Sequence, residues 1–163
     1  DPSLHLGGSK AALVEFQGMT VPPNAAREIY RLRMSGIVPV LAHPERYRGA
    51  TVEQVEEWRG AGAVTQIDGA MLFGRAPMCR LARALLQQGL ADCIASDNHA
   101  DDRSLGTVRR WLEELGAPEQ AALLLDTNPA RLLADEGVLP VDPIPDADEG
   151  VFARLRSLIT GRP

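Results

Sequence analysis

Cysteine is scarce in this sequence, and neither of the common cysteine-based sites is present. Cys79 and Cys93 are the only cysteines among 163 residues, and no Cys-x-x-Cys zinc pattern occurs. The Cys-x5-Arg loop of the cysteine-based phosphatases is also missing, because Leu85 and His99 stand where its arginine would follow the two cysteines. We therefore expect two reduced structural thiols, which favours a cytoplasmic protein.

Long apolar runs and an excess of basic residues are also missing. No run approaches the length of a membrane-spanning helix, and no signal peptide is visible. The formal net charge is −5 at pH 7, whereas nucleic acids and acidic membranes attract basic surfaces. We therefore expect neither nucleic-acid binding nor membrane insertion. The apolar content of 45% is ordinary for a globular domain that buries a core.

Short apolar runs alternate with helical patterns along most of the chain. The runs expected to form strands are residues 12–16, 38–42, 64–67 and 91–95. Apolar residues at helical spacing predict helices over residues 23–35, 51–60, 75–88, 104–115, 118–125 and 129–134. Gly36 and Gly89 mark the ends of the first and third helices. This alternation predicts an α/β fold with parallel strands, either a barrel or an open sheet.

The C-terminal part of the chain has a different character. Three prolines and three aspartates within residues 140–149 disfavour regular structure and predict a linker. Residues 150–163 carry apolar side chains on one helical stripe, which predicts an amphipathic helix that packs on its own domain or binds a partner. The predicted organisation is a main domain over residues 1–139, followed by this linker and this helix.

Side chains suited to binding metal or phosphate follow three of the expected strands. They are Glu15 in the first run, His43 and Arg46 after the second, and Asp97 and His99 after the fourth. The carboxyl ends of parallel strands meet on one face, where α/β folds build their sites, so residues far apart in sequence can meet there. Mixed histidine and carboxylate ligands suit Mn, Fe or Zn better than Ca or Mg.

Each of these residues also fits an ordinary structural role. Taken alone, Glu15 fits a solvated residue at the end of a strand. His43, which precedes a proline, fits a histidine that only hydrogen-bonds the backbone. Asp97 fits an Asx-type turn, and Glu45 with Arg46 fits a surface ion pair of little energetic consequence. The set is more informative than its members, because two of the three histidines lie beside carboxylates at strand ends.

Several longer motifs resemble those of one family. They are Leu13-Val14-Glu15-Phe16, Val21-Pro22-Pro23, Ala42-His43-Pro44-Glu45-Arg46-Tyr47, Ile94-Ala95-Ser96-Asp97-Asn98-His99 and Asn128-Pro129. In this order and spacing they resemble the CpsB/CapC tyrosine phosphatases of the polymerase-and-histidinol-phosphatase (PHP) superfamily. The resemblance implies that the chain forms part of a distorted (β/α)7 PHP barrel with parallel strands. It also implies a trinuclear site that binds manganese, iron or zinc.

The resemblance further implies roles for individual residues. Those matched to metal ligands are Glu15, His43, Asp97 and His99, with Glu15 as a bridging carboxylate. Arg46 and Arg103 match arginines near the substrate phosphate, a role suited to the planar donor fork of a guanidinium. The family's His-x-His motif has no counterpart in this sequence. We therefore expect the natural protein to carry a further N-terminal segment of the barrel.

The activity implied by the resemblance is hydrolysis of phosphotyrosine on a protein by metal-activated water. The implied partner is the tail of a capsule or exopolysaccharide tyrosine kinase. Two alternatives stay open. One is a small-molecule phosphatase related to histidinol-phosphate phosphatase, and the other is a catalytically inactive module that binds a phosphorylated tail through Arg46 and Arg103. The identity of the metal and the oligomeric state, a homo-oligomer included, also stay open.

Overall fold

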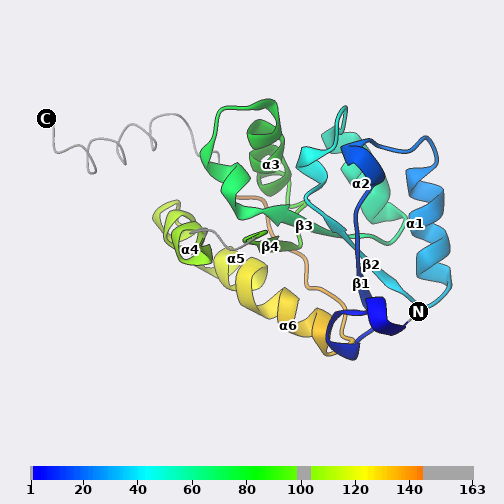
Figure 1. The fold of residues 1–163 in the computed structure, drawn as a ribbon. Helices are drawn as coiled ribbons and strands as arrows, with labels where there is room; N and C mark the ends of the chain where they lie inside the picture. The colour runs from blue at the N-terminus through cyan, green and yellow to red at the C-terminus, as the bar shows by residue number, and fades with distance from the viewer. Residues whose placement is uncertain (1, 99–103, 145–163) are drawn as a thin grey trace, which may run out of the picture.

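A four-stranded parallel sheet forms the centre of the molecule (Figure 1). The computed structural model describes residues 2–98 and 104–144. The strands are β1 (Ala11–Val14), β2 (Val38–Ala42), β3 (Val64–Asp68) and β4 (Cys93–Ala95), hydrogen-bonded in the order β1-β2-β3-β4. Each pairing is parallel, which confirms the expected α/β architecture.

A helix follows each strand, because parallel neighbours need a crossover connection. The helices are α1 (Ala25–Met34), α2 (Val52–Gly60), α3 (Pro77–Gln87) and α4 (Leu105–Glu114). Short 3-10 turns begin the loops after the first three strands, and these are η3 (Gln17–Met19), η4 (Pro44–Arg46) and η5 (Gly69–Phe73). Within the described residues, none of the helices is long and apolar enough to cross a membrane.

The last helical region is continuous, although the sequence predicted two separate helices. It consists of α5 (Pro118–Ala122), the π-helical turn η6 (Leu123–Thr127) and α6 (Asn128–Leu133). The backbone N–H of Asn128 donates to the carbonyl of Leu123, five residues earlier. A proline has no N–H to donate and crowds the turn before it, and the wider π turn accommodates Pro129 without breaking the helix.

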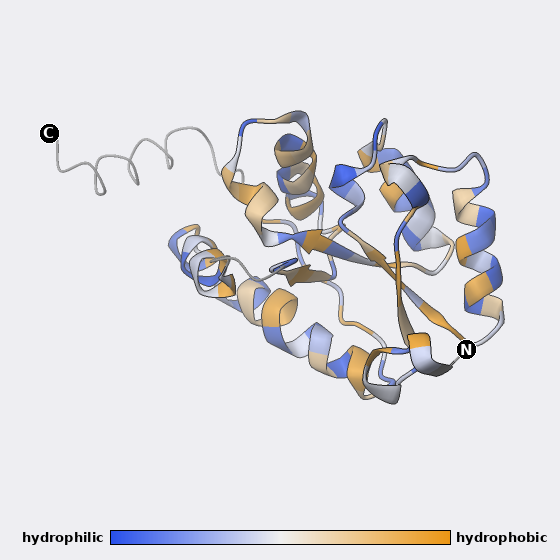
Figure 2. Ribbon diagram, in the orientation of Figure 1, coloured by the Kyte–Doolittle hydropathy of each residue, from blue (hydrophilic) through white to orange (hydrophobic). Residues whose placement is uncertain are grey.

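The two faces of the sheet pack against different elements. One face places Leu41, Ile67 and Ile94 against helices α1 to α5 in two apolar clusters. The opposite face places Val40, Val64 and Cys93 in a smaller cluster with Leu132 of α6. Figure 2 shows the resulting pattern, with apolar strands inside and helices that carry polar residues on their outer sides. Most of the apolar core therefore lies between the sheet and the helices that follow its strands.

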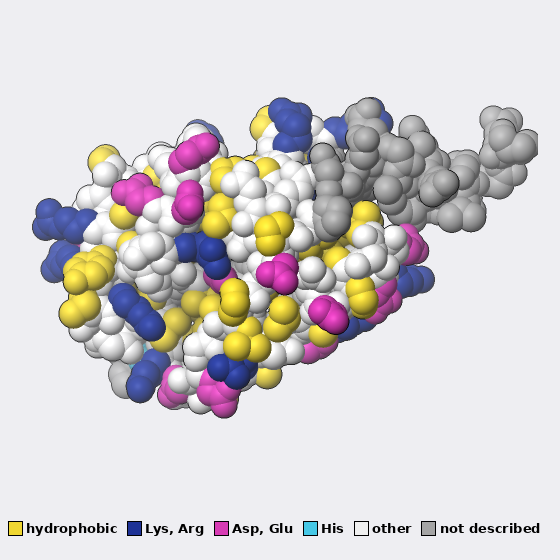
Figure 3. All heavy atoms as spheres, turned by 180° about the vertical axis from the view of Figure 1, so that it is seen from behind, with side chains coloured by type: hydrophobic (Ala, Val, Ile, Leu, Met, Phe, Trp, Pro, Cys, Tyr) yellow, Lys and Arg dark blue, Asp and Glu magenta, His cyan; other side chains and the backbone are white. Residues whose placement is uncertain are grey.

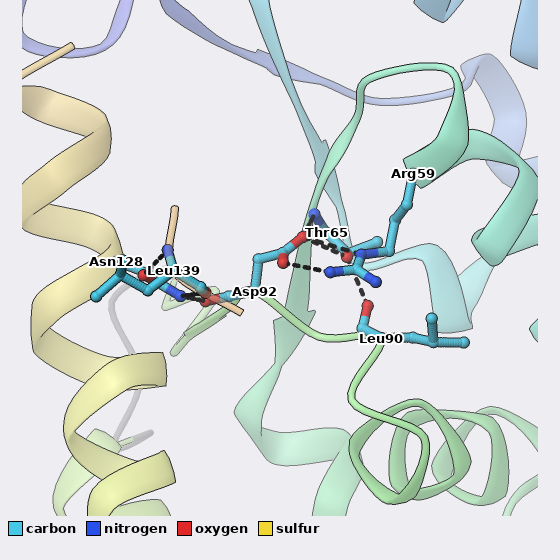
Figure 4. A network of polar contacts seen from close by, with 6 residues as sticks. All are labelled: Arg59, Thr65, Leu90, Asp92, Asn128 and Leu139. Atoms are coloured by element: carbon cyan, nitrogen blue, oxygen red, sulfur yellow. Dashed lines mark hydrogen bonds and ion pairs between the residues drawn. The ribbon is translucent and has the colours of Figure 1, made fainter. Parts of the chain in front are cut away.

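A polar network closes the amino ends of β3 and β4 (Figure 4). Asp92 is only 2% exposed, and both of its carboxylate oxygens accept hydrogen bonds from the guanidinium of Arg59, at 2.7 and 3.3 Å. The backbone N–H and the hydroxyl of Thr65 also donate to this carboxylate, at 2.8 and 2.9 Å. The buried charge is thus paired and hydrogen-bonded, as a buried carboxylate requires.

Asn128 extends this network to the last described segment of the chain. Its side-chain amide donates to the carbonyls of Asp92 and Leu139, each at 2.9 Å, and its oxygen accepts from the N–H of Leu139 at 2.8 Å. Asn128 is fully buried, and its side chain satisfies three backbone groups, one of Asp92 and two of Leu139. This arrangement fixes the chain after α6 against the sheet.

The described part of the expected linker packs on the core. Residues 140–144 form neither helix nor strand, but Val141 and Ile144 are buried in the cluster that contains Ile67 and Ile94. The N–H of Ile144 donates to the carbonyl of Leu86 at the end of α3. Residues 145–163, which include the rest of the expected linker and the expected C-terminal helix, lie outside the described residues. The division at residue 140 stays a prediction.

Candidate functional site

Polar side chains follow the carboxyl ends of the strands, and the structure brings several of them together. Glu15 follows β1, His43 follows β2, Asp68 ends β3, and Asp97 follows β4. His43 and Asp97 both have a left-handed backbone, with φ of 34° and 47°. This conformation is uncommon for residues other than glycine and concentrates at functional sites. The carboxyl end of the sheet is therefore the candidate site.

Glu15 and His43 face each other across the ends of β1 and β2. The His43 Nε2 and Glu15 Oε2 atoms are 3.8 Å apart, with His43 buried and the Glu15 side chain 50% exposed. This separation exceeds a hydrogen bond. It suits two atoms bound to one metal at about 2.1 Å each. The other ring nitrogen of His43, Nδ1, is buried and has no hydrogen-bond partner among the described residues.

Tyr47 ties together the two segments that carry this pair. Its buried hydroxyl donates to the carbonyl of Ala42 at 2.7 Å and accepts from the N–H of Phe16 at 3.3 Å. These groups belong to the residues next to His43 and Glu15. Burial raises the pKa of the phenol well above its usual range, so the hydroxyl keeps its proton. The Phe16 ring packs 4.7 Å from that of Tyr47 and holds it in place.

Arg46 lies between two carboxylates from different strands. Its Nη1 donates to Asp97 Oδ2 at 2.5 Å, and its Nη2 lies 3.6 Å from Asp68 Oδ2. The structure therefore brings together Arg46 and Asp97, two of the residues that the sequence singled out. Asp97 was expected as a metal ligand, and here its carboxylate is paired with this guanidinium.

Glu45 and Asp68 are buried members of the site that sequence reasoning missed. Glu45 is 2% exposed, so the interpretation of Glu45 and Arg46 as a surface pair is wrong. One Glu45 oxygen accepts from the backbone N–H of Asp68 at 2.8 Å, and burial raises the pKa of Glu45 to about 8. Asp68 Oδ1 accepts from the N–H of Ala70. Asp68 could have been found from its place between a buried strand and Gly69, where other strands carry site residues.

Two of the predicted site residues are not placed. His99 and Arg103 lie outside the described residues. Within residues 2–98 and 104–144, no group of three or more histidine, cysteine, aspartate or glutamate side chains is arranged to hold a metal ion. The metal-binding and phosphate-binding roles of the six predicted site residues stay predictions.

The cysteines take no part in this site. Cys79 and Cys93 are both free and buried. Burial raises the pKa of Cys93 to about 12, and the neighbouring carboxylate of Asp92 acts in the same direction. A thiol that keeps its proton in this way is a poor nucleophile, so Cys93 is unsuited to a cysteine-based reaction.

The fold and the strand-end residues define a parallel α/β protein with a histidine–carboxylate site beside a carboxylate-bound arginine. The family described as capsular polysaccharide synthesis, CpsB/CapC, matches residues 2–134. This chain belongs to the CpsB/CapC family.

Individual relatives agree with this assignment. Tyrosine-protein phosphatase YwqE of Bacillus subtilis is 32% identical over 101 residues, which are 59% of this chain and 39% of that protein. Tyrosine-protein phosphatase CpsB of Streptococcus pneumoniae is 29% identical over 144 residues, which are 80% of this chain and 59% of that protein. The chain thus spans about two fifths to three fifths of the length of these relatives.

The fold is also similar to a solved structure. This chain superposes on one of the crystal structures reported for YwqE from Bacillus subtilis and CpsB from Streptococcus pneumoniae, which are described as metal-dependent tyrosine phosphatases. The TM-score is 0.72 and the sequence identity is 28%. The match covers 88% of this chain and 60% of that chain. The likeness extends over nearly all of the described elements, which supports the interpretation of the sheet as part of a PHP-type phosphatase fold.

Proposed function

We propose that this chain takes part in the metal-dependent hydrolysis of phosphotyrosine on proteins, in the synthesis of capsule or exopolysaccharide. The observation that carries the proposal is the Glu15–His43 pair, whose facing atoms are 3.8 Å apart at the carboxyl end of the sheet. Relatives that share this part of the chain are named tyrosine-protein phosphatases. The buried, proton-bound thiol of Cys93 gives no support to a cysteine-based reaction.

The residues present fit a divalent metal such as manganese. Glu15 and His43 would hold it, and we propose that Asp97 and His99 are ligands of two different metals in the same site. The 3.8 Å separation between His43 Nε2 and Glu15 Oε2 supports this, because it is longer than a hydrogen bond and suits two atoms that bind one metal. A metal bound here would act as a Lewis acid that polarises water and the phosphate oxygens. Tyr47 would hold Glu15 and His43 in register, through its bonds to their neighbours.

Arg46 is suited to binding the substrate phosphate. Its planar fork of donors matches phosphate oxygens, and Asp68 and Asp97 orient it from two sides. An incoming phosphate would take over the Arg46 donors that now point at Asp97. We propose that Arg103 supplies a second positive charge to the same phosphate.

The first test is hydrolysis of p-nitrophenyl phosphate and of a phosphotyrosine peptide by the intact natural protein with added manganese. We expect turnover that chelation abolishes and that alkylation of the cysteines does not. His43→Ala should remove both metal and activity, whereas Arg46→Ala should lower activity with the metal content nearly intact. Activity that survives thorough chelation, or equal metal loss in the two variants, would contradict the assignment.

A comparison of substrates separates this proposal from its two alternatives. We propose that the protein acts in the cytoplasm and that its substrate is a phosphotyrosine protein, namely the tail of a bacterial tyrosine kinase. Faster hydrolysis of histidinol phosphate than of phosphotyrosine peptides would point to a small-molecule phosphatase. Tight binding of the phosphopeptide without any turnover in manganese would point to a catalytically inactive binding module.

A further inference from the structure

A cavity separate from the Glu15–His43 pair lies between the loops that follow β1 and β2. Its volume is about 450 Å³, and its walls include Val21, Pro22 and Pro23 from the first loop. Arg48 contributes from the second loop, and Arg27 from the first turn of α1. Neither the metal pair nor the Arg46 cluster uses any of these residues.

The backbone around this cavity is held in shape by contacts between the two loops. The N–H of Arg48 donates to the carbonyl of Met19 at 2.9 Å, and Thr20 and Arg48 form a parallel bridge. The guanidinium of Arg48 also donates to the carbonyl of Gly18 at 3.2 Å. Two consecutive prolines stiffen the facing wall because their φ angles are fixed. The cavity is thus preformed, which lowers the entropy lost on binding.

The charges around the cavity favour an anion. Arg27 and Arg48 are both exposed, and neither pairs with a carboxylate among the described residues. Glu57 is the one acidic side chain in the wall. The amino terminus of α1 adds partial positive charge. The Asn24 side chain does not cap this terminus, because its amide donates to Glu28 instead.

The cavity and the candidate site share the same two loops. The first loop begins at Glu15 and continues into Val21 and the prolines, and the second carries Arg46 two residues before Arg48. The two arginines serve different places, since Arg46 donates to Asp97 and Arg48 to the carbonyl of Gly18. The cavity is therefore connected to the candidate site through the same two loops.

We propose that this cavity binds a second anionic side chain of the substrate peptide, near the phosphotyrosine that reacts. Arg27 and Arg48 pair with the anion, and the Val-Pro-Pro wall packs against the apolar part of the same side chain. The anion is a second phosphotyrosine or an acidic residue, which share the chemistry that a guanidinium recognises. This inference rests on the proposed phosphotyrosine-protein substrate and adds a preference for clustered negative charge within it.

The test uses labelled peptides in which the reacting residue is a non-hydrolysable phosphonate analogue of phosphotyrosine. Separate peptides carry a second phosphonate residue, a glutamate or a glutamine at successive positions before or after the reacting residue. The Kd of each peptide for the manganese-loaded protein is measured by fluorescence anisotropy. We expect the anionic peptides to bind roughly three- to tenfold more tightly than the glutamine peptide at the best position. The ranking of phosphonate against glutamate identifies the preferred source of the anion.

Three substitutions assign the preference to the cavity. Arg27→Gln and Arg48→Gln should each shrink the anionic-to-neutral ratio of Kd values by roughly threefold, and Glu57→Gln should enlarge it. The matched control is Arg33→Gln, on the same helix as Arg27 but at its far end, which should leave the ratio unchanged. If Arg48→Gln fails to fold, Arg27→Gln and Glu57→Gln decide the question.

Equal binding of anionic and neutral peptides, or an equal effect of Arg33→Gln and Arg27→Gln, would overturn the inference. Hydrolysis of p-nitrophenyl phosphate by the unsubstituted protein is measured in parallel. Failure of that hydrolysis together with an intact anionic preference would refute the proposed catalysis and retain the peptide site. Turnover without any preference for anionic peptides would support the proposed catalysis and refute the peptide site.

Discussion

The amino and carboxyl ends of the sheet bury polar side chains in opposite ways. At the amino ends, the carboxylate of Asp92 accepts hydrogen bonds from Arg59 and Thr65 on both of its oxygens. At the carboxyl ends, His43 Nδ1 and Glu45 Oε2 are buried without a hydrogen-bond partner among the described residues. One end of the sheet is thus satisfied internally, and the other retains groups that could bind something else.

The difference shows which buried polar groups stabilise this fold and which reduce its stability. A buried polar group that is fully bonded contributes to stability or costs little, whereas an unsatisfied one costs about 1–3 kcal/mol. In parallel α/β folds the carboxyl ends of strands carry the chemistry and the amino ends carry stability. The surface charges do not show such a division on the face seen in Figure 3, where Lys and Arg are interspersed with Asp and Glu.

The largest effect on stability is expected for Asp92→Ala at the amino end. The substitution removes the carboxylate from Arg59 and leaves the buried N–H of Thr65 without its acceptor. We expect the free energy of unfolding to fall by about 3 kcal/mol or more in urea denaturation. Asp126→Ala is the matched control, because its pair with Arg109 is exposed and should contribute less than about 1 kcal/mol. Similar losses of unfolding free energy in Asp92→Ala and Asp126→Ala would show that the buried network contributes no more than an exposed ion pair.

Asn128→Ala should have the next largest effect. The substitution removes one buried hydrogen bond to the backbone of Asp92 and two partly buried ones to that of Leu139, at about 1 kcal/mol each. We expect a loss of about 2–3 kcal/mol and faster hydrogen exchange at the N–H of Leu139. Unchanged exchange at that amide would show that the segment after α6 is held by other contacts, such as the burial of Val141 and Ile144.

Tyr47→Phe should have a smaller effect on stability and a clear effect on the site. The ring and its packing remain, but the carbonyl of Ala42 and the N–H of Phe16 lose their partner. We expect a loss of about 1 kcal/mol in stability and a manganese affinity weaker by roughly tenfold in calorimetry, because the metal pair is no longer held. Tyr30→Phe is the control, since Tyr30 is exposed on α1 and should change neither quantity. Unchanged manganese affinity in Tyr47→Phe would argue against the positioning role.

His43→Ala should have the smallest effect on the stability of the metal-free protein. The substitution removes a buried ring, but it also removes an unsatisfied nitrogen, so the two terms offset each other to within about 1 kcal/mol. Metal binding and turnover should nevertheless be lost, as measured by elemental analysis and by p-nitrophenyl phosphate hydrolysis. A destabilisation as large as that of Asp92→Ala would show that His43 is a structural residue and that the two ends of the sheet do not differ.

Most of the elements could be predicted from the sequence because their signals are local. The expected strand over residues 38–42 coincides with β2, and the other strands and the first four helices agree to within a few residues. The first strand was placed too far along, because Phe16 leaves the sheet to pack against Tyr47 and Trp58. The π turn that joins the last helices was not predicted, since no periodicity marks an i to i+5 hydrogen bond.

The candidate site could be located only in part. Strand-end chemistry identified Glu15, His43 and Asp97, because parallel strands bring their carboxyl ends together. It could not reveal that Glu45 points inward, since an acidic residue after a His-Pro pair looks exposed in a sequence. Nor could it tell that Asp97 pairs with Arg46, because a charge partner 51 residues away depends on loop conformation.

The alternation of parallel strands and helices, and the places where the strands end, follow from the amino-acid sequence alone, which also predicts the residues that bind metal or phosphate there. These features depend on the spacing of apolar side chains and on backbone preferences within a few residues, which are local. The folded structure is needed to learn that Asp92 is fully hydrogen-bonded and that Nδ1 of His43 has no partner among the described residues. The reason is that hydrogen bonding and burial of a side chain depend on atoms contributed by distant parts of the chain, which meet only in the folded protein.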